Sequence, residues 1–354
     1  MPSSIDKGAD HVTRLALAGL GSYLPERVVE NDELGALVGM TPSRIKSLFE
    51  IDRRHWARAH DRAQAAQGQT LSDLAASAAA SALADAGVSA RELDTIVAVS
   101  IAPEYISPPL DALIRKKIGA GELTGYTLHS ACTGVFRATA LVESLMRAGR
   151  SRVALVVAAE TLSPYFQFGP DVPKDLRMSY ALYGDGAAAM VLVADEPSLP
   201  AVDAITAVTT DDDDAPGIMV RGPLAEPSVA GLGTAAAGSL AYHDFRRVLD
   251  KGGPLTRRAA DAVLETLGKT LDDADHLLTH QATGHMREIG AKLGLPVDKL
   301  RVNIDHVGNT ISASILILMD ELKRAGRFAP QELLVLHSAE SATWSYGGMA
   351  VHWR

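Results

Sequence analysis

Hydrophobic positions along the chain fall into two alternating kinds of segment, short runs rich in β-branched residues and longer stretches rich in alanine and leucine. The short runs predict buried strands at 15–20, 95–101, 152–159, 187–193, 276–280, 333–337 and 349–353. The longer stretches predict helices at 71–86, 256–267 and 311–325. Strands that alternate with helices in this way indicate an α/β fold.

Two breaks in this rhythm predict how the chain is organised. Residues 1–13 are polar and predict a loose tail. Residues 196–240 are rich in Pro, Gly and Asp, a composition typical of a junction between structured parts. We therefore expect an N-terminal half at residues 1–195 and a C-terminal half at residues 196–354.

A short internal repeat relates the two halves. Residues 146–150 read MRAGR and residues 323–327 read KRAGR, and each motif ends an apolar helix that is followed by a strand ending in glutamate. Cys132 and Asn309 each lie 17 residues before the glycine of their own motif. The two residues therefore occupy matching positions, each at the start of the same helix in a duplicated unit.

His280 joins this pair through a second match between the halves. The runs DTIVAVS at 94–100 and DHLLTHQ at 275–281 correspond to each other, which places His280 just past the carboxyl end of a strand. Open α/β sheets bind ligands at the carboxyl ends of their strands. If the halves pack about a pseudo-twofold axis, we expect His280 to meet Cys132 and Asn309 at one site.

These three residue types suit acyl transfer. A thiol directly before a helix faces free amide groups and the positive end of the helix dipole, which favour the thiolate and can hold an oxyanion. Taken singly the signals are weak, because a free Cys is usually inert, Asn is a common helix cap, and His280 is one of eleven histidines. Their matching positions in the two duplicated halves predict that Cys132 is a nucleophile assisted by His280 and Asn309.

The chain resembles the β-ketoacyl-acyl-carrier-protein synthase III family. SACTG at 130–134, HQAT at 280–283 and HVGNTISAS at 306–314 resemble its three signature segments. Further similarity lies at 21–34, 100–109 and 182–192. The resemblance implies a thiolase-like α/β fold, in which two duplicated halves form a five-layered αβαβα arrangement, and it implies a homodimer. It also implies that Cys132 carries the acyl group, with His280 and Asn309 as partners.

The sequence departs from the family pattern near the expected oxyanion hole. SAESATW at 338–344 replaces the glycine-rich segment that supplies an oxyanion-hole amide in relatives, and Thr283 replaces an asparagine. A backbone N–H can come from any residue except proline. We therefore expect an oxyanion hole built from the amide groups of Cys132 and of Glu340 or Ser341.

A second departure concerns the residues that grip coenzyme A. Ile45 stands where relatives carry a tryptophan, and Leu48 or Phe49 stands near their arginine position, so the stacking surface for the nucleotide is lost. We expect the nearby basic side chains to face an acidic carrier protein instead, although a solvated basic face explains them equally well. This candidate carrier-binding set is Arg44, Lys46, Arg53, Arg54 and Arg58.

Three functional hypotheses follow. The favoured one is transfer of an acyl group from a carrier-protein or coenzyme A thioester, through Cys132, to a small-molecule hydroxyl or amine in secondary metabolism, with His280 removing the acceptor's proton. The alternative is decarboxylative condensation with a malonyl thioester, in which His280 and Asn309 stabilise an enolate. The third is a catalytically silent thiolase-fold subunit that only binds partners. The retention of all three polar residues argues against this hypothesis.

Composition narrows the partners and the location. With 43 acidic and 34 basic residues, the net charge of −9 argues against nucleic acid or an anionic membrane as the main partner. The N-terminus lacks the apolar core of a signal peptide, and no apolar run reaches the roughly 20 residues of a membrane span. Residues 211–214 are consecutive aspartates, typical of a solvated loop. We expect a cytoplasmic protein with no cofactor and no metal.

Overall fold

The computed structural model describes residues 14–58, 68–220 and 241–354, so the polar tail predicted at 1–13 lies outside the described residues. Ten strands of the described chain form one sheet in the order β12-β11-β13-β14-β8-β1-β7-β6-β4-β5. At its centre, β1 and β8 pair through only two residue pairs, Leu15 with Val202 and Ala16 with Ala201. This narrow join divides the sheet into two groups of five strands.

The two groups of strands have the same topology. Each consists of three parallel strands followed by two antiparallel ones, in the orders β5-β4-β6-β7-β1 and β12-β11-β13-β14-β8. The first group comprises β1 (Leu15–Tyr23), β4 (Thr95–Ser100), β5 (Thr124–His129), β6 (Val153–Glu160) and β7 (Gly186–Ala194). The second comprises β8 (Ala201–Thr209), β11 (His276–Thr279), β12 (Leu300–Arg301), β13 (Leu333–Glu340) and β14 (Ser345–His352). The duplication inferred from the repeated motif is therefore present in the fold.

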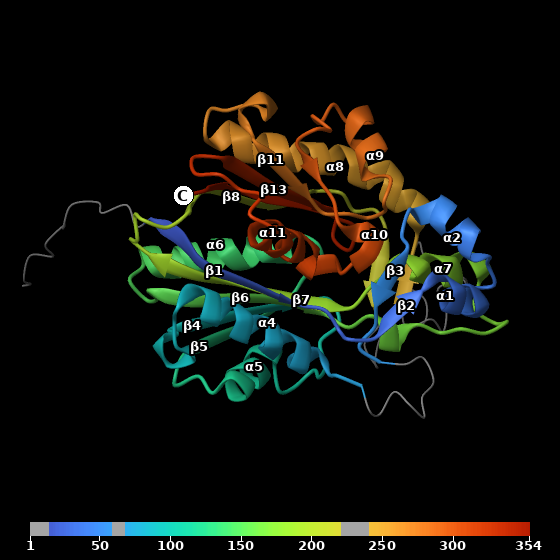
Figure 1. Cartoon of the computed structure of the whole chain (residues 1–354), viewed down its shortest axis with the longest axis horizontal. Helices are drawn as coiled ribbons and strands as arrows, with labels where there is room; N and C mark the ends of the chain where they lie inside the picture. Colours follow the sequence, from blue (N-terminus) through green and yellow to red (C-terminus); the bar gives the residue numbers. More distant parts are fainter. Residues whose placement is uncertain (1–13, 59–67, 221–240) are drawn as a thin grey trace, which may run out of the picture.

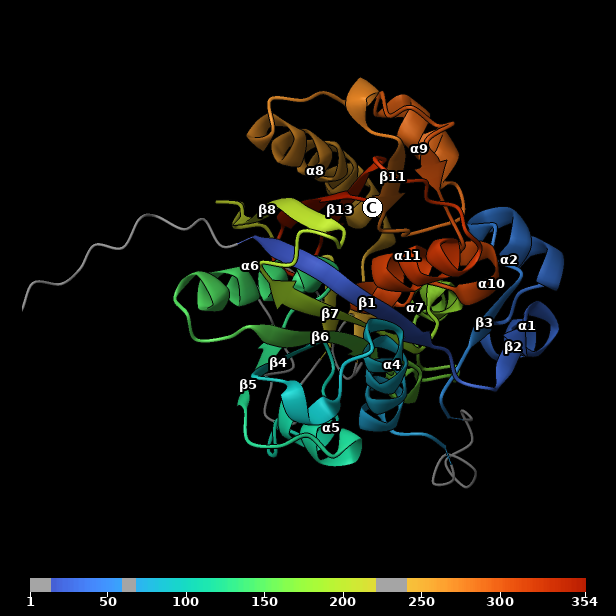
Figure 2. The same ribbon diagram turned by 60° about the vertical axis from the view of Figure 1, so that its left-hand side comes forward.

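Helices and sheets alternate in five layers (Figure 1). The middle layer holds α6 (Gly134–Arg147) and α11 (Ser314–Arg324), which lie between the two groups of strands when the molecule is turned as well (Figure 2). The outer layers hold α4 (Leu71–Ala86) and α5 (Leu110–Ile118) on one face, and α8 (Phe245–Thr266) and α9 (Met286–Lys292) on the other. The expected αβαβα arrangement of a thiolase-like fold is confirmed.

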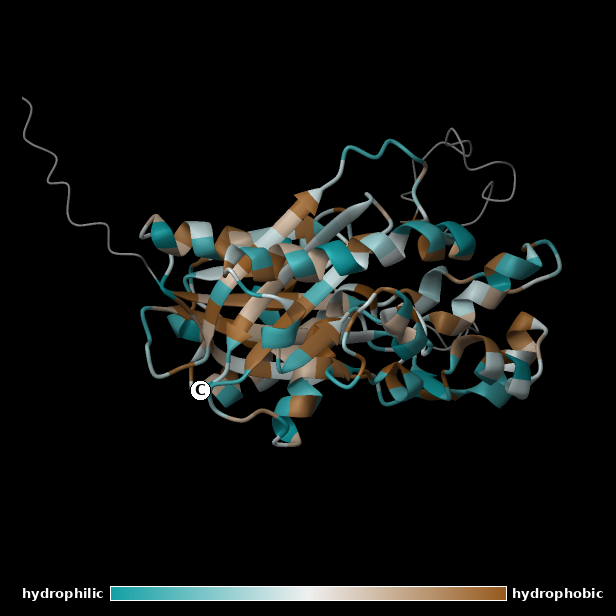
Figure 3. Cartoon of the chain, turned by 90° about the horizontal axis from the view of Figure 1, so that it is seen from above, coloured by the Kyte–Doolittle hydropathy of each residue, from teal (hydrophilic) through white to brown (hydrophobic). Residues whose placement is uncertain are grey.

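Hydrophobic residues concentrate on the strands of the central layers, whereas the outer helices carry polar residues on their exposed sides (Figure 3). Small residues let α4 lie close to its sheet, since a Cβ added at Gly21 of β1 would approach the backbone nitrogen of Ala82 to 2.3 Å. Among the described residues, no helix combines the length and apolar character that crossing a membrane requires.

The remaining elements gather at one end of the molecule (Figure 1). They are α1 (Asn31–Val38), α2 (Pro42–Phe49), α7 (Lys174–Ser179), α10 (Ile304–Val307), β2 (Val28–Glu30), β3 (Arg53–His55), β9 (Ile218–Val220) and β10 (Ala241–His243). Several of them border the cavity that holds the candidate catalytic residues.

Two boundaries predicted from the sequence, a helix start and the junction between the halves, differ in the structure. The helix expected at 256–267 is the later part of α8, which begins earlier because the Asp244 carboxylate caps it by accepting the Arg247 amide N–H at 3.0 Å. The expected junction at 196–240 contains β8, the strand that meets β1 at the centre of the sheet, and its residues 221–240 lie outside the described ones. A division into halves at residue 195 remains our proposal, with β8 opening the second half.

Candidate active site

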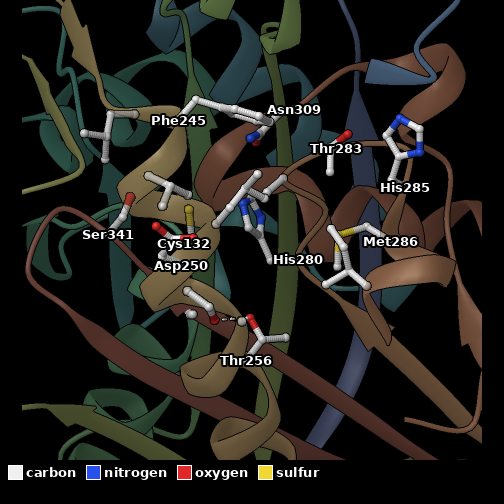
Figure 4. A pocket seen from close by; sticks show the side chains of 18 of the residues that line it. Cys132, Phe245, Asp250, Thr256, His280, Thr283, His285, Met286, Asn309 and Ser341 are labelled. Atoms are coloured by element: carbon white, nitrogen blue, oxygen red, sulfur yellow. Dashed lines mark hydrogen bonds between the residues drawn. The ribbon is translucent and has the colours of Figure 1, made fainter. Parts of the chain in front are cut away.

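Cys132, His280 and Asn309 line one cavity of about 680 Å³. Cys132 lies in the turn before α6, His280 follows β11, and Asn309 lies between α10 and α11. Figure 4 shows the sulfur, the imidazole and the carboxamide grouped together at this cavity. The structure thus brings the three sequence-predicted residues together, and their chemical roles remain a proposal.

The electrostatics of Cys132 differ from the sequence-based expectation. Burial, then the nearby carboxylates of Glu340 and Glu160, raise the pKa of the Cys132 thiol well above its ordinary value. The expectation that the start of a helix favours a thiolate here was therefore wrong, because desolvation and negative charge outweigh the helix dipole.

His280 is buried and electrically neutral. Its Nδ1 lies 3.1 Å from the Ser314 hydroxyl, and its backbone N–H donates to the carbonyl of His337 at 3.0 Å. Burial lowers the pKa of His280 to about 4. The hydrogen bond to Ser314 holds Nδ1, so Nε2 is the ring nitrogen left to bind a ligand or exchange a proton.

The side chain of Asn309 has a defined orientation. Its Oδ1 accepts the backbone N–H of Ile311 at 2.9 Å, and because a backbone N–H can only donate, the partner atom is the oxygen of the carboxamide. The two N–H bonds of Asn309 are therefore the part of the side chain that is left to bind a ligand in the cavity.

Main-chain contacts between the halves fix the position of Asn309. Its N–H donates to the carbonyl of Leu182 at 2.8 Å, and its carbonyl accepts the N–H of Gly184 at 3.1 Å. Gly308 makes this close approach possible, since it has φ 79° and ψ 178°, a region restricted to glycine, and an added Cβ would lie 3.0 Å from the nitrogen of Gly184.

Comparison with known proteins identifies the family of this chain. Two family models match, "3-Oxoacyl-[acyl-carrier-protein (ACP)] synthase III" over residues 126–208 and its C-terminal counterpart over residues 264–353. A β-ketoacyl-[acyl-carrier-protein] synthase III from Bordetella petrii is 31% identical over 345 residues, covering 94% of this chain and 97% of that relative. A synthase III from Xanthomonas campestris is 32% identical over 330 residues, covering 91% and 93% of the two chains.

This chain belongs to the β-ketoacyl-acyl-carrier-protein synthase III family.

Solved structures agree with this assignment. The crystal structure of 3-oxoacyl-(acyl carrier protein) synthase III from Pseudomonas aeruginosa PAO1 has a TM-score of 0.79 at 28% identity and covers 96% of this chain and 98% of its own. The tetronic acid condensing enzyme AbyA1 has a TM-score of 0.83 at 24% identity over 96% and 99% of the two chains, and thus shares the fold.

The segment that replaces the family's glycines contributes to the cavity in an unexpected way. Ala339 and Ser341 line the cavity, whereas Glu340 turns its buried side chain beneath the Cys132 turn. The predicted oxyanion-hole role of the Cys132 and the Glu340 or Ser341 amides remains a proposal. Reasoning from the sequence missed the position of the Glu340 carboxylate, although the repeat does end in matching glutamates, Glu160 and Glu340.

The residues at the family's nucleotide-gripping positions are apolar in this synthase III relative. Ile45 is fully buried, and Phe49 is buried with its ring 6.1 Å from that of Phe245 in a T-shaped contact. Leu48 lines the cavity. Thr283, which replaces the family asparagine, also lines the cavity and donates to the carbonyl of Phe49 at 3.3 Å. No stacking surface is presented at position 45.

Four of the five candidate carrier-binding residues lie at or near the surface. Arg44 and Arg53 are exposed, and Lys46 is exposed and pairs with Asp52 at 2.7 Å. Arg58 is half-buried and donates from Nε to the carbonyl of Gln69 at 3.3 Å. The placement of these four is compatible with a carrier-binding role, which remains a proposal.

Arg54, the fifth candidate, belongs to the core, and the expectation that it faces a carrier protein was wrong. The residue is 0% exposed and donates to Asn31 Oδ1 at 2.7 Å and to the carbonyl of Ala181 at 2.8 Å. Burial lowers the pKa of Arg54 to about 10. A carrier protein therefore has no access to Arg54, which instead ties β3 to α1 and to the segment before Gly184.

His243 is a cavity residue that the sequence alone did not single out. It lines the same cavity as Cys132, and its ring makes T-shaped contacts with Tyr183 and Phe245. Its buried Nδ1 has no hydrogen-bond partner among the described residues, and burial lowers the pKa of His243 to about 4. The sequence around it offers no repeat or periodic pattern that would have marked this residue.

The acidic run at 211–214 makes ion pairs. The ammonium group of Lys251 pairs with Asp212 at 2.5 Å and also with Asp214. Elsewhere in the described chain, Glu50, His285 and Glu288 are the one group whose possible ligand atoms lie within 4.8 Å of one another, and both carboxylates are exposed.

A Gly308→Ala substitution tests how Asn309 is positioned. We expect a loss of about 2 kcal/mol or more in the free energy of unfolding, because the left-handed backbone is strained and the new Cβ would lie 2.8 Å from that of Arg54. The matched control is Gly149→Ala, whose φ of 68° is also left-handed but whose Cβ would meet no atom within 4 Å. Denaturant unfolding should show the larger loss for Gly308→Ala, and equal losses would mean that the close approach at Gly308 does not matter.

The ionisation of His280 is open to direct measurement. Because burial lowers its pKa to about 4, the imidazole should stay neutral as the pH falls from 7 to 5, where an ordinary histidine becomes charged. Nitrogen-15 NMR of histidine-labelled protein, with the His280 signals assigned by their loss in His280→Gln, measures this. A titration midpoint near pH 6.5 for His280 would contradict this prediction.

Proposed function

We propose that the chain catalyses a decarboxylative condensation, in which an acyl group carried on Cys132 is joined to a malonyl thioester. The observation that carries this proposal is the orientation of Asn309, whose oxygen is engaged by Ile311 so that its N–H groups are left for a ligand beside His280. Two N–H donors at one point suit the oxygen of an enolate. This geometry favours condensation over the acyl transfer to oxygen or nitrogen that the sequence alone suggested.

The proposed reaction has two halves. In the first, the Cys132 sulfur attacks the carbonyl of the donor thioester, the donor's sulfur leaves and takes up the thiol proton, and an acyl-enzyme forms. In the second, the malonyl carboxylate leaves as carbon dioxide, and its bonding electrons form an enolate whose oxygen is held by Asn309 and His280. The enolate carbon attacks the acyl carbonyl, and the sulfur of Cys132 leaves and takes up one proton from the solvent, which balances the loss of the malonyl carboxylate as neutral carbon dioxide.

The donor we propose is a carrier-protein thioester. The relatives are named for their acyl-carrier protein, and this chain lacks an exposed aromatic residue at position 45 to stack on the coenzyme A nucleotide. The exposed Arg44, Lys46 and Arg53 form the carrier face in this proposal, with Arg58 at its edge. We also propose a cytoplasmic homodimer that needs no cofactor.

Transfer to a hydroxyl or amine of a small molecule in secondary metabolism remains a second candidate. The observation that favours it is the neutral imidazole of His243, which lines the cavity and whose buried Nδ1 has no hydrogen-bond partner among the described residues. In this reaction His280 removes the acceptor's proton, and the resulting oxygen or nitrogen attacks the acyl-Cys132 carbonyl.

Carbon dioxide release separates these two candidates. Wild-type enzyme given an acyl-carrier protein and a malonyl-carrier protein should release carbon dioxide at the rate of product formation. Asn309→Ala should slow release by about 10²–10³-fold, the usual cost of losing one donor to a developing oxyanion, while acylation of Cys132 continues. Product formation from a hydroxyl or amine acceptor without carbon dioxide would replace condensation with the second candidate.

Intact-mass spectrometry tests whether the chain is an enzyme or a silent subunit. Incubation with a panel of acyl-carrier and acyl-coenzyme A thioesters should add one acyl mass to the wild type, because the thiol of Cys132 is the only one in the sequence. Cys132→Ala should gain no mass. Absence of any adduct in the wild type with every donor would support the silent-subunit hypothesis.

A further inference from the structure

A buried carboxylate lies directly beneath the nucleophile. Oε2 of Glu340 accepts the backbone N–H of Thr133 at 3.0 Å, the Thr133 hydroxyl at 2.6 Å and the Ser130 hydroxyl at 3.0 Å. Oε1 accepts the hydroxyl of Thr343 at 3.2 Å. The side chain of Glu340 is 2% exposed. These contacts enclose the turn that holds Cys132, which lies between Ser130 and Thr133.

Glu340 is surrounded by hydrogen-bond donors. All four partners donate to it, and the backbone N–H of Thr133 has no other option. Donors around a buried carboxyl group offset part of the cost of burying it as a carboxylate. Arg137 is the positively charged residue in this hydrogen-bond network. Its Nε donates to the Thr133 hydroxyl at 3.4 Å and does not bond to Glu340.

Glu160 is the symmetric counterpart and behaves differently. It ends β6 as Glu340 ends β13, and it accepts the hydroxyls of Ser100 and Ser312 and the backbone N–H of Ile101. Burial raises the pKa of Glu160 to about 8, so this group is largely neutral at pH 7. After burial, the charge of Glu340 is the largest cause that raises the pKa of the Cys132 thiol, ahead of Glu160.

The other groups that face Cys132 do not compensate for this charge. His280 is neutral because burial lowers its pKa to about 4, and Tyr183 is neutral because burial raises its pKa. Asn309 is uncharged. The carboxylate of Glu340 also occupies the Thr133 amide, one of the first free N–H groups of α6, which would otherwise stabilise an anion at this helix start.

We propose that Glu340 holds Cys132 as an unreactive neutral thiol in the free enzyme, so that the sulfur loses its proton only while it attacks a bound donor. The proposal rests on the proposed role of Cys132 as the acyl carrier. Glu340 acts through Cys132 and is thus a positioning residue. The proton departs with the donor's sulfur, so that one S–H bond and one thioester are consumed and one of each is formed. A neutral thiol also reacts slowly with oxidants and alkylating reagents.

Alkylation of the single thiol by iodoacetamide, followed by intact mass between pH 6 and 10, tests the proposal. The wild type should react with a midpoint above pH 9. Glu340→Gln keeps the size of the side chain and an accepting oxygen but removes the charge, so its reaction rate at pH 7 should rise at least tenfold. Cys132→Ala should take up no reagent.

Glu160→Gln is the matched control. It alters the other buried glutamate near the thiol, but because Glu160 is largely neutral at pH 7, its replacement should leave the pH 7 rate within about twofold of the wild type. A wild-type midpoint below pH 8, an unchanged rate in Glu340→Gln, or an equal rise in Glu160→Gln would each overturn the proposal. The wild-type midpoint requires no variant, so the test stands even if Glu340→Gln fails to fold.

The same experiments distinguish failure of this inference from failure of the proposed function. If thioesters never acylate the wild type, the chain is not an acyl carrier, yet the alkylation profile still reports whether Glu340 controls the thiol. If acylation occurs and the alkylation profile of Glu340→Gln matches the wild type, the proposed function stands and the role of Glu340 is wrong.

Discussion

The burial of two symmetric helices between two sheets is the interaction on which the site depends. Phe136 of α6 and Leu316 of α11 are fully buried in one hydrophobic cluster that includes side chains from both groups of strands. Cys132 lies in the loop just before α6, and Asn309 lies in the loop that leads into α11. The apolar packing that stabilises the fold therefore also sets the positions of the nucleophile and its partner, so a precise site needs no separate scaffold.

Two buried glutamates also lie near the centre of the molecule. The central strands β6 and β13 both end in glutamate beneath the loops of the middle helices. Burying a carboxylate is costly unless donors surround it. Glu160 escapes part of that cost by remaining largely protonated at neutral pH, whereas Glu340 is held by Thr133 and Ser130. The two glutamates thus end equivalent strands of the two halves, and Glu340 lies beneath the turn that holds the nucleophile.

The sequence predicted the features that periodicity and duplication encode, and missed those that depend on tertiary contacts. Cys132 and Asn309 were located because a repeated motif follows both, and the α/β layers followed from the alternation of apolar runs. The burial of Arg54 was not predicted because its partner Asn31 lies 23 residues away, and no local sequence pattern indicates that this arginine is buried. The charge environment of Cys132 was misjudged because Glu340, more than 200 positions later, contacts the Cys132 turn only in the folded chain.

The loss of the family's glycines near the cavity is compatible with catalysis because of where the new side chain goes. A glycine segment keeps a pocket floor free of side chains, and a glutamate there would fill the cavity if it pointed inward. Ala339 and Ser341 line the cavity with small side chains, and Glu340 between them points away, as alternation along a strand requires. This placement is compatible with the proposed oxyanion-hole role of the backbone amides. What the substitution adds is a negative charge beneath the sulfur, which destabilises a thiolate in the free enzyme and disfavours a bare thiolate as the leaving group. The acyl-enzyme should for that reason persist until the attacking carbon and the proton for Cys132 arrive together.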